Sequence, residues 1–314
     1  MIHKINTLYN GIIMISAAAL MIFSLAGCTA ATGQKTFHSG QDATDTFIKA
    51  LRADDPDELL SIFGTDANEL IFSGDSVMDT LRRDMFLEAY DRQHRLDAKE
   101  DQLILVVGQN DWPFPIPLIK QDQKWIFDTA AGKEEILQRR IGRNELNTIQ
   151  VLLAIVDAQR EYAMNDLDGD GLCEYAQQFH SEAGKKNGLY WKTEEGEKPS
   201  PLGLLVALAK EAGYTEQDKN SANEPQPYFG YFYRMLTAQG QNAPGGAFEY
   251  IIKDNMIGGF AVIAYPADYG NSGVMTFVVN HDGIVHQKDL GENTAQEATK
   301  IDLFDPNEAW EKVQ

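Results

Sequence analysis

The chain has 314 residues, and its 47 Asp and Glu outnumber its 27 Lys and Arg, which gives a formal net charge of -20 at pH 7. Because a surface of that sign repels the phosphates of nucleic acids, we expect no nucleic-acid partner. The length fits two ordinary domains better than one. With only two cysteines, stability must come from packed cores and not from a disulfide framework.

The first 27 residues have the pattern of a cleaved export signal. Lys4 precedes an apolar run over residues 12–25, which is the order of the basic and apolar regions in such signals. A single membrane helix is the alternative, but the run is shorter than the roughly 20 residues that span a bilayer. The run closes on the sequence Leu-Ala-Gly-Cys at residues 25–28.

This ending is similar to the bacterial lipobox, and the resemblance implies a signal peptide over residues 1–27 and a covalent lipid on Cys28. Three acyl chains, at about 0.8 kcal/mol for each buried methylene, hold a protein on a membrane permanently. Thr29 stands where lipoproteins retained in the inner membrane carry Asp. The resemblance therefore implies an outer-membrane lipoprotein that faces the periplasm or the exterior and contacts the membrane through its lipid.

The second cysteine, Cys173, has no partner within the chain once Cys28 is lipidated. We therefore expect no intramolecular disulfide. We predict that Cys173 is buried as a small apolar side chain. The alternative is an exposed thiol that can pair with another chain.

The first half of the chain predicts a tether and then an α+β domain. Residues 28–41 are small and polar without a period, which predicts a flexible tether, and residues 42–138 form the predicted domain. Its predicted elements are helices over residues 43–51, 56–63 and 83–95, then strands over 102–108, 116–120 and 124–128, with a polar turn at 121–123. This order, with a late Lys-Trp-Ile-Phe strand, resembles the cone-shaped fold of the nuclear transport factor and cystatin type.

The second half, residues 139–314, predicts one long helix packed on an antiparallel sheet. Residues 144–164 are the most periodic segment of the chain, and the predicted apolar face of this helix comprises Leu146, Ile149, Leu153 and Val156. The elements predicted after it are a short helix over residues 202–212 and strands over 231–237, 249–253, 259–265, 274–280 and 284–288. Asp282-Gly283 predicts the hairpin turn between the last two strands.

Two segments of this half resemble the soluble head of type IV pilins and pseudopilins. One is Ala-Gln-Arg-Glu-Tyr at residues 158–162, which ends the helix before an acidic, glycine-rich loop, and the other is Phe-x-x-x-Ala-x-Pro at residues 260–266. No prepilin cleavage site followed by an apolar helix leads into this domain. The resemblance therefore implies a pilin-like head without a fibre-forming role.

A calcium site is predicted in the loop after the long helix. The candidate ligands are the carboxylates of Asp166, Asp168, Asp170 and Glu174 and the carbonyl of Leu172. Alternate carboxylates around a glycine bend supply the hard oxygen ligands that calcium prefers. Gln177 replaces the bidentate glutamate at the last position of the full calcium loop. The alternative is a solvated turn that ends the helix without metal.

Two further segments are candidates for recognition. Residues 111–117 contain three prolines at alternate positions, which predicts an edge strand or a stiff connector from which Trp112 and Phe114 project. These rings either form a recognition surface or pack beneath a loop. The second segment holds Arg139, Arg140 and Arg143, which either bind an anionic ligand through bidentate contacts or pair with neighbouring carboxylates across the junction of the domains.

The stretches at residues 111–118, 127–132, 139–146, 157–162, 188–191, 236–240 and 273–283 resemble the bacterial envelope family catalogued as domain of unknown function number 2950. The similarity covers residues 40–310 and implies an exported protein without an established activity. No nucleophile elbow or zinc-binding His-Glu-x-x-His helix is present in the sequence. We therefore expect a non-catalytic, lipid-anchored binding or scaffold module for a partner protein or surface polymer. The alternative is a periplasmic small-molecule binder or hydrolase that uses a concavity of the first domain, bounded by Trp125 and Phe127.

Overall fold

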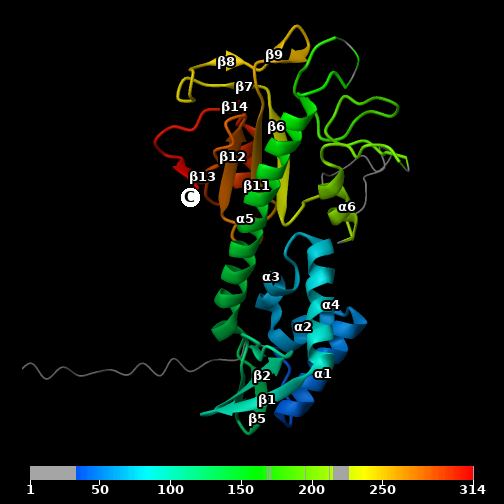
Figure 1. Ribbon diagram of the computed structural model, residues 1–314. Coiled ribbons are helices and arrows are strands. Elements are labelled where there is room, and N and C mark those ends of the chain that lie inside the picture. The colour runs from blue at the N-terminus through cyan, green and yellow to red at the C-terminus, as the bar shows by residue number, and fades with distance from the viewer. Residues whose placement is uncertain are drawn as a thin grey trace, which may run out of the picture.

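The computed structural model describes residues 33–167, 169, 171–194, 196–211, 213–214 and 226–313. The predicted signal peptide, the lipidation site Cys28 and two of the candidate calcium ligands, Asp168 and Asp170, lie outside the described residues. Within these ranges, no helix combines the length and the apolar character that crossing a bilayer requires. The described residues form a mixed α+β structure, with two lobes joined by one long helix (Figure 1).

Helices with side-chain caps begin the first lobe. They are α1 (Gly40–Ala53), α2 (Pro56–Phe63) and α4 (Ser76–Arg92), with the short η1 (Thr65–Ala67) and α3 (Asn68–Ile71) between the second and the third. Ser39, Asp55 and Asp75 cap α1, α2 and α4, because each side chain accepts a hydrogen bond from a backbone N–H of the first turn. We predicted that the third helix begins at Arg83, but the cap starts it at Ser76.

An antiparallel sheet completes the first lobe. Its order is β1-β2-β4-β5, with β3 paired to β2, and the strands are β1 (His94–Lys99), β2 (Gln102–Val107), β3 (Trp112–Pro113), β4 (Leu118–Gln121) and β5 (Lys124–Phe127). The helix predicted as far as residue 95 ends at Arg92, because every residue from His94 to Lys99 pairs with β2. Asp122 and Gln123 have φ of 48° and 67°, which is the type I′ geometry of a tight hairpin.

The helix α5 (Thr129–Tyr162) runs for 34 residues from the first lobe into the second (Figure 1). We predicted its later part, over residues 144–164, but not the turns before it. The boundary predicted between residues 138 and 139 falls inside this helix. Gly132 lets the first turns of α5 pack closely against the segment before β4 in the first lobe, since a Cβ there would lie 2.6 Å from the carbonyl oxygen of Pro115.

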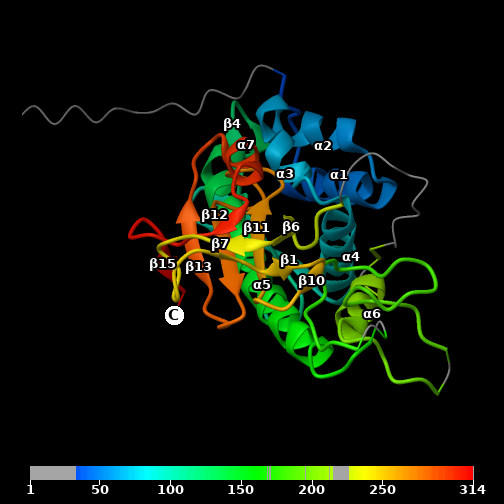
Figure 2. The same cartoon turned by 90° about the horizontal axis from the view of Figure 1, so that it is seen from above.

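The second lobe contains a five-stranded antiparallel sheet with α5 across one face (Figures 1 and 2). Its order is β15-β13-β12-β11-β6, and the strands are β6 (Tyr231–Leu236), β11 (Ala261–Pro266), β12 (Met275–Asn280), β13 (His286–Asp289) and β15 (Glu311–Lys312). The first four confirm predicted strands. Smaller elements are α6 (Gly203–Glu211), β7 (Ala238–Gln239), β10 (Asn255–Met256), α7 (Thr294–Thr299) and β14 (Leu303–Phe304). The strand predicted over residues 249–253 is divided into β8 (Phe248–Glu249) and β9 (Ile251–Ile252).

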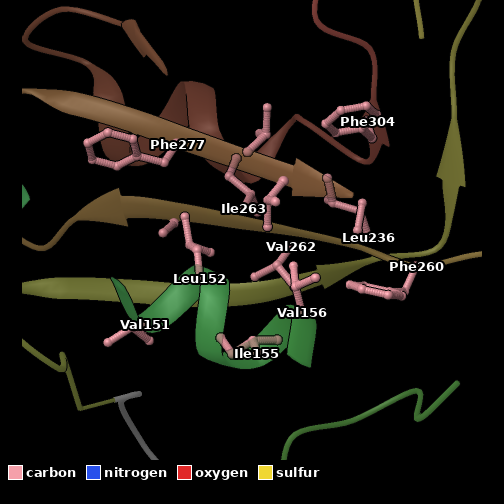
Figure 3. Close-up of a cluster of buried hydrophobic side chains, with 14 of the residues drawn as sticks. Val151, Leu152, Ile155, Val156, Leu236, Phe260, Val262, Ile263, Phe277 and Phe304 are labelled. Atoms are coloured by element: carbon pink, nitrogen blue, oxygen red, sulfur yellow. The ribbon is translucent and has the colours of Figure 1, made fainter. Parts of the chain in front are cut away.

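The core of the second lobe lies between α5 and the sheet. Leu152 and Val156 point toward the strands, while Val151 and Ile155 lie on another side of the helix (Figure 3). All four are buried, but Leu146, which we placed on the apolar face, is 67% exposed. Our predicted face was wrong at that position because the buried side of α5 is turned away from Leu146 and passes through Thr148, Leu152 and Ile155.

Buried polar groups join the two lobes. The carboxylate of Asp75, which is 2% exposed, accepts hydrogen bonds from the hydroxyl of Tyr214 at 2.6 Å and from the N–H of Gly230 at 2.9 Å. The amide of Asn271 donates to the carbonyl of Phe72 at 2.9 Å. Since a buried carboxylate needs such donors, these contacts hold the lobes in a fixed relation.

Candidate functional site

The candidate site is a cavity of about 840 Å³ in the second lobe, beside α5 and the edge strand β6 of the sheet. It lies between α5, α6, the start of β6 and the connecting segment over residues 179–192. Its size falls within the range of small-molecule sites, which are concave and mostly apolar with a few polar groups. We refer to it below as the α5–α6 cavity.

The floor of this cavity is aliphatic. Val151 and Ile155 come from α5, where their spacing of four residues places them on one side of the helix. Leu202, Leu205 and Val206 approach from the start of α6. The carbonyl of Leu202 accepts from the N–H of Val206 at 3.1 Å, and its own N–H donates to the carbonyl of Leu189 at 2.9 Å. Backbone hydrogen bonds thus fix the start of α6 and attach it to the connecting segment at Leu189, while α5 supplies the rest of the floor.

Aromatic side chains form the walls. The rings that line the cavity are Phe179, Tyr190, Trp191, Tyr214, Tyr228, Phe232 and Tyr233. The hydroxyl of Tyr233 lies 3.3 Å from the Thr148 hydroxyl oxygen. Burial raises the pKa of Tyr228 to about 12, and burial also raises the pKa of Tyr233. Both phenols therefore stay protonated at neutral pH, and they offer neutral polar groups instead of charges.

The segment that brings Tyr190 and Trp191 to the cavity depends on a close backbone approach. Its two arms are paired, since Tyr190 N–H donates to the carbonyl of Phe179 at 2.8 Å and Ser181 N–H donates to the carbonyl of Tyr190 at 2.8 Å. A Cβ on Gly188 would lie 2.7 Å from the backbone of Ser181. Only glycine lets the arms approach this closely, which explains the glycine at residue 188.

Positive charge lies along the rim of the cavity. Four lysines line it, namely Lys185, Lys186, Lys192 and Lys210, against the two carboxylates of Glu182 and Glu197. The Lys185 amine pairs with Glu182 at 2.6 Å. The Lys186 amine lies 5.6 Å from the centre of the Trp191 ring, within the range of a cation–π contact. The rim thus has the opposite sign to the chain as a whole.

A smaller cavity of about 240 Å³ adjoins the first and shares Lys186, Trp191 and Glu197 with it. Its other walls include Leu167, Pro199 and Pro201. Because Trp191 lines both spaces, its ring stands at their boundary. A ligand longer than the α5–α6 cavity could continue past this ring.

The predicted calcium loop has its acidic groups in backbone hydrogen bonds. Asp166 accepts from the N–H of Gly169 at 2.8 Å and from the N–H of Gly171 at 3.0 Å. Glu174 is buried and accepts from the N–H of Met256 at 2.7 Å, and Leu172 is exposed. In the part of the chain that the structure describes, no three His, Cys, Asp or Glu side chains are placed to hold a metal. With Asp168 and Asp170 outside that part, the calcium site stays a prediction.

Cys173 in this loop is an exposed free thiol. Our expectation that it is buried was wrong. The neighbouring Glu174 occupies the buried position of this stretch, because its carboxylate satisfies the Met256 N–H, and adjacent side chains of an extended segment point in opposite directions.

Only one of the two rings of the predicted aromatic segment lies at the surface. Trp112 is 38% exposed and makes an edge contact with Phe86 at 6.2 Å between ring centres. Phe114 packs against the buried cluster of the first lobe and lies 5.2 Å from Phe47. Trp112 therefore retains an open face, whereas Phe114 packs beneath the segment.

The three predicted arginines separate into different roles. Arg140 is buried between the lobes, where its guanidinium donates to the carbonyls of Glu69 at 2.6 Å and Leu70 at 2.8 Å and also to the side chain of Asn271. Burial lowers its pKa to about 10. Arg139 pairs with Glu135 and lies 5.9 Å from the centre of the Trp112 ring, and Arg143 is exposed. They do not converge on one ligand site.

The concavity predicted in the first lobe is occupied by rings at Phe127. This side chain is 1% exposed and packs against Phe63 at 5.1 Å and Phe47 at 5.7 Å between ring centres. Trp125 is half-buried at the edge of the same cluster. The α5–α6 cavity in the second lobe was missed by our sequence reading, because its walls come from four segments and no local motif connects them.

Comparison with curated proteins and with solved structures gives no match to this chain. The model of one family, described as "Protein of unknown function (DUF2950)", matches residues 34–313. This range includes both lobes, the long helix and all residues named at the α5–α6 cavity. The family predicted from the short stretches of the sequence is thereby confirmed, and the chain belongs to the DUF2950 family.

Proposed function

We propose that this protein is a non-catalytic, lipid-anchored binding module of the bacterial outer membrane, and that its ligand occupies the α5–α6 cavity. The observation that supports binding most directly is the combination of a cavity of about 840 Å³ with an aliphatic floor, aromatic walls and a polar rim. The lipid anchor rests on the sequence Leu-Ala-Gly-Cys at residues 25–28. In this arrangement Cys28 tethers the lobes to the membrane, and the second lobe presents the cavity to a small molecule or to a segment of a surface polymer.

We also propose that the second lobe is related to the pilin head and the first lobe to the cone-shaped fold of the nuclear transport factor and cystatin type. One long helix across an antiparallel sheet supports the pilin-like interpretation of the second lobe. Capped helices followed by the meander of β4 and β5 support the cone-like interpretation of the first. In a pilin-like head without a polymerising helix, the exposed surface serves recognition, which agrees with a binding role.

The binding proposal is tested by identifying compounds that the protein retains from an envelope extract. A soluble form that begins at Thr29 retains every residue that the structure describes. We would incubate it with an envelope extract, wash it, denature it and identify the released compounds by mass spectrometry. Val206→Trp fills the floor of the cavity, and Val313→Trp is its control, because Val313 is half-buried outside the cavity and follows β15, at the opposite edge of the sheet from β6. We expect a compound that is released from the natural protein and from the control but not from Val206→Trp. Identical release from all three forms would place the ligand elsewhere.

The anchor is tested by labelling. Cells that express the full chain would be fed a radioactive fatty acid, with Cys28→Ala as the matched variant. We expect label on the natural protein only. An unlabelled chain that retains residues 1–27 would refute the anchor and the outer-membrane location together, while the cavity test above would still stand.

A calcium-stabilised loop is a second element of the proposal. Asp166 already arranges the N–H groups of Gly169 and Gly171 into a tight turn at the end of α5, and the acidic loop there would be neutralised by a divalent cation. We expect the melting temperature to rise by several degrees with calcium but not with magnesium. Asp166→Asn should abolish the difference. Equal melting with and without calcium would remove this element alone.

A further inference from the structure

The rim of the α5–α6 cavity suggests what the ligand carries. Among the residues that the structure describes, four lysines and two glutamates line the cavity, although the whole chain has a formal net charge of -20. One of these carboxylates, on Glu182, is already paired with Lys185. A local excess of positive charge within a strongly negative protein attracts an anion to this place.

Two of the lysines are available to such an anion. Neither Lys186 nor Lys192 forms an ion pair with another residue in the described part of the chain. Lys186 is held near the cavity by the Trp191 ring, 5.6 Å from its amine. A cation placed over an indole keeps its charge and its three donors, so it can bind an anionic head without first breaking a salt bridge.

The part of the cavity at Tyr214 lies beside a carboxylate. The hydroxyl of Tyr214, which lines the cavity, donates to the buried carboxylate of Asp75 at 2.6 Å. Asp75 in turn lies close to the Arg82 guanidinium, which offsets its charge, so a ligand anion beside Tyr214 would gain little attraction. The anionic group is therefore expected at the lysine rim, with the remainder of the ligand directed over the floor.

The floor selects against a sugar. Val151, Ile155 and Val206 offer no hydrogen-bonding side chain. Burial of a hydroxyl against such a surface without a partner is unfavourable, whereas burial of a methylene strengthens binding. An aliphatic chain satisfies the floor, and an acidic polysaccharide does not.

We propose that the ligand is an amphiphilic anion, in which an aliphatic chain lies on Val151, Ile155 and Val206 and a single anionic head group lies at Lys186 and Lys192. This inference rests on the proposed function, because it names the chemical class that the cavity binds. A carboxylate and a phosphate are both suited to lysine, which acts as a point charge. The two sources of the head group are separated by the choice of probes.

The probes are decanoate, decyl phosphate, 1-decanol and decyltrimethylammonium, each titrated by calorimetry into the soluble form that begins at Thr29. We expect decanoate or decyl phosphate to bind at least tenfold more tightly than 1-decanol and the cation to bind most weakly. Octanoate should bind about fifteenfold more weakly than decanoate, since each buried methylene corresponds to a factor of about four. A preference between decanoate and decyl phosphate identifies the head group.

The matched variants locate the anion. Lys186→Gln combined with Lys192→Gln keeps the side chains near their original length and should weaken decanoate about tenfold while leaving 1-decanol unchanged. Lys300→Gln is the control, because this exposed lysine lies outside the cavity and pairs with Glu297. Circular dichroism and the melting temperature verify that each variant is folded.

The outcomes separate this inference from the proposed function. Equal affinity for decanoate and 1-decanol would overturn the anionic head but leave the cavity as a binding site. Binding of a trigalacturonate in place of every aliphatic probe would replace the class with an acidic polysaccharide. If no aliphatic probe binds, the inference fails, and the release experiment with Val206→Trp decides independently whether the cavity binds anything else.

Discussion

The buried carboxylate of Asp75 is the contact whose loss we expect to affect both lobes. It caps α4 by accepting from the Met78 N–H at 3.0 Å, and it reaches across to the Tyr214 hydroxyl at 2.6 Å and the Gly230 N–H at 2.9 Å. In Asp75→Ala, the cap costs about 1 kcal/mol. The two buried donors of the second lobe, on Tyr214 and Gly230, lose a charged acceptor, which costs roughly 1–3 kcal/mol for each. We expect the free energy of unfolding to fall by about 3–7 kcal/mol in total.

The control for this substitution is another aspartate cap in the same lobe. Asp55 accepts from the Glu58 N–H at 3.0 Å at the start of α2, but it is exposed, and this side-chain hydrogen bond stays within the first turn of α2. Asp55→Ala should therefore lower the free energy of unfolding by only about 1 kcal/mol. The measurement is urea unfolding of both variants, followed by far-ultraviolet circular dichroism and by tyrosine fluorescence. Equal losses for the two variants would refute the view that Asp75 holds the lobes together.

Asp75→Ala should also affect ligand binding in the α5–α6 cavity. Tyr214 lines the α5–α6 cavity and receives its orientation from Asp75. Loss of the carboxylate frees the ring to move, so binding of an amphiphilic probe should weaken in Asp75→Ala and remain unchanged in Asp55→Ala. Unaltered binding in a folded Asp75→Ala protein would show that Tyr214 is positioned by its packing alone.

Three other predictions concern helix packing, pH and a binding segment. Gly142→Ala should stabilise α5 by about 0.5–1 kcal/mol, because a Cβ at that position meets nothing within 4 Å. Gly132→Ala should destabilise the protein, because its Cβ would lie 2.6 Å from a backbone oxygen. Chemical unfolding compares the two variants, and a change of the same sign in both free energies of unfolding would contradict the close approach at Gly132. Burial lowers the pKa of His286, so the unfolded chain binds the proton more readily, and stability should fall as the pH drops below about 6.5. The measurement is the urea midpoint between pH 7.5 and 5, and His286→Gln should reduce its decrease toward low pH. If the midpoint of His286→Gln depends on pH as that of the natural protein does, the loss of stability comes from other groups. Gly188→Ala should force the paired arms of the segment apart, because its Cβ would lie 2.7 Å from the Ser181 backbone, and calorimetry should show weakened probe binding in a folded variant.

Local patterns predicted several elements at the correct places. The cap and Pro at residues 55–56 and the glycine at 64 define α2, since Pro56 suits the first turn and the N–H of Gly64 closes the last. Asp122 adopts positive φ at the tight turn before β5, as expected for such a hairpin. Each of these signals acts between neighbours in the chain, so the sequence alone is sufficient to locate it.

Other elements could not be read in this way. His94–Lys99 has no strong alternation and becomes a strand because β2 pairs with it residue by residue. Leu146 fits an apolar helical period but is exposed, whereas Val151 is buried because a second segment covers α5. Arg140 was expected either to bind an anionic ligand or to pair with carboxylates at the junction of the domains, and it is instead enclosed there by the backbone carbonyls of Glu69 and Leu70.

The sequence by itself determined the acidic charge, the family, the α+β class and the expectation of a lipid on Cys28, because each depends on composition or on residues adjacent in the chain. Only the tertiary structure decided where a ligand could bind. The α5–α6 cavity takes Ile155, Trp191 and Val206 from three separate segments, and the positive rim emerges only when those segments meet. A binding site is a property of surfaces brought together by packing, and no local pattern of residues specifies which surfaces will face each other.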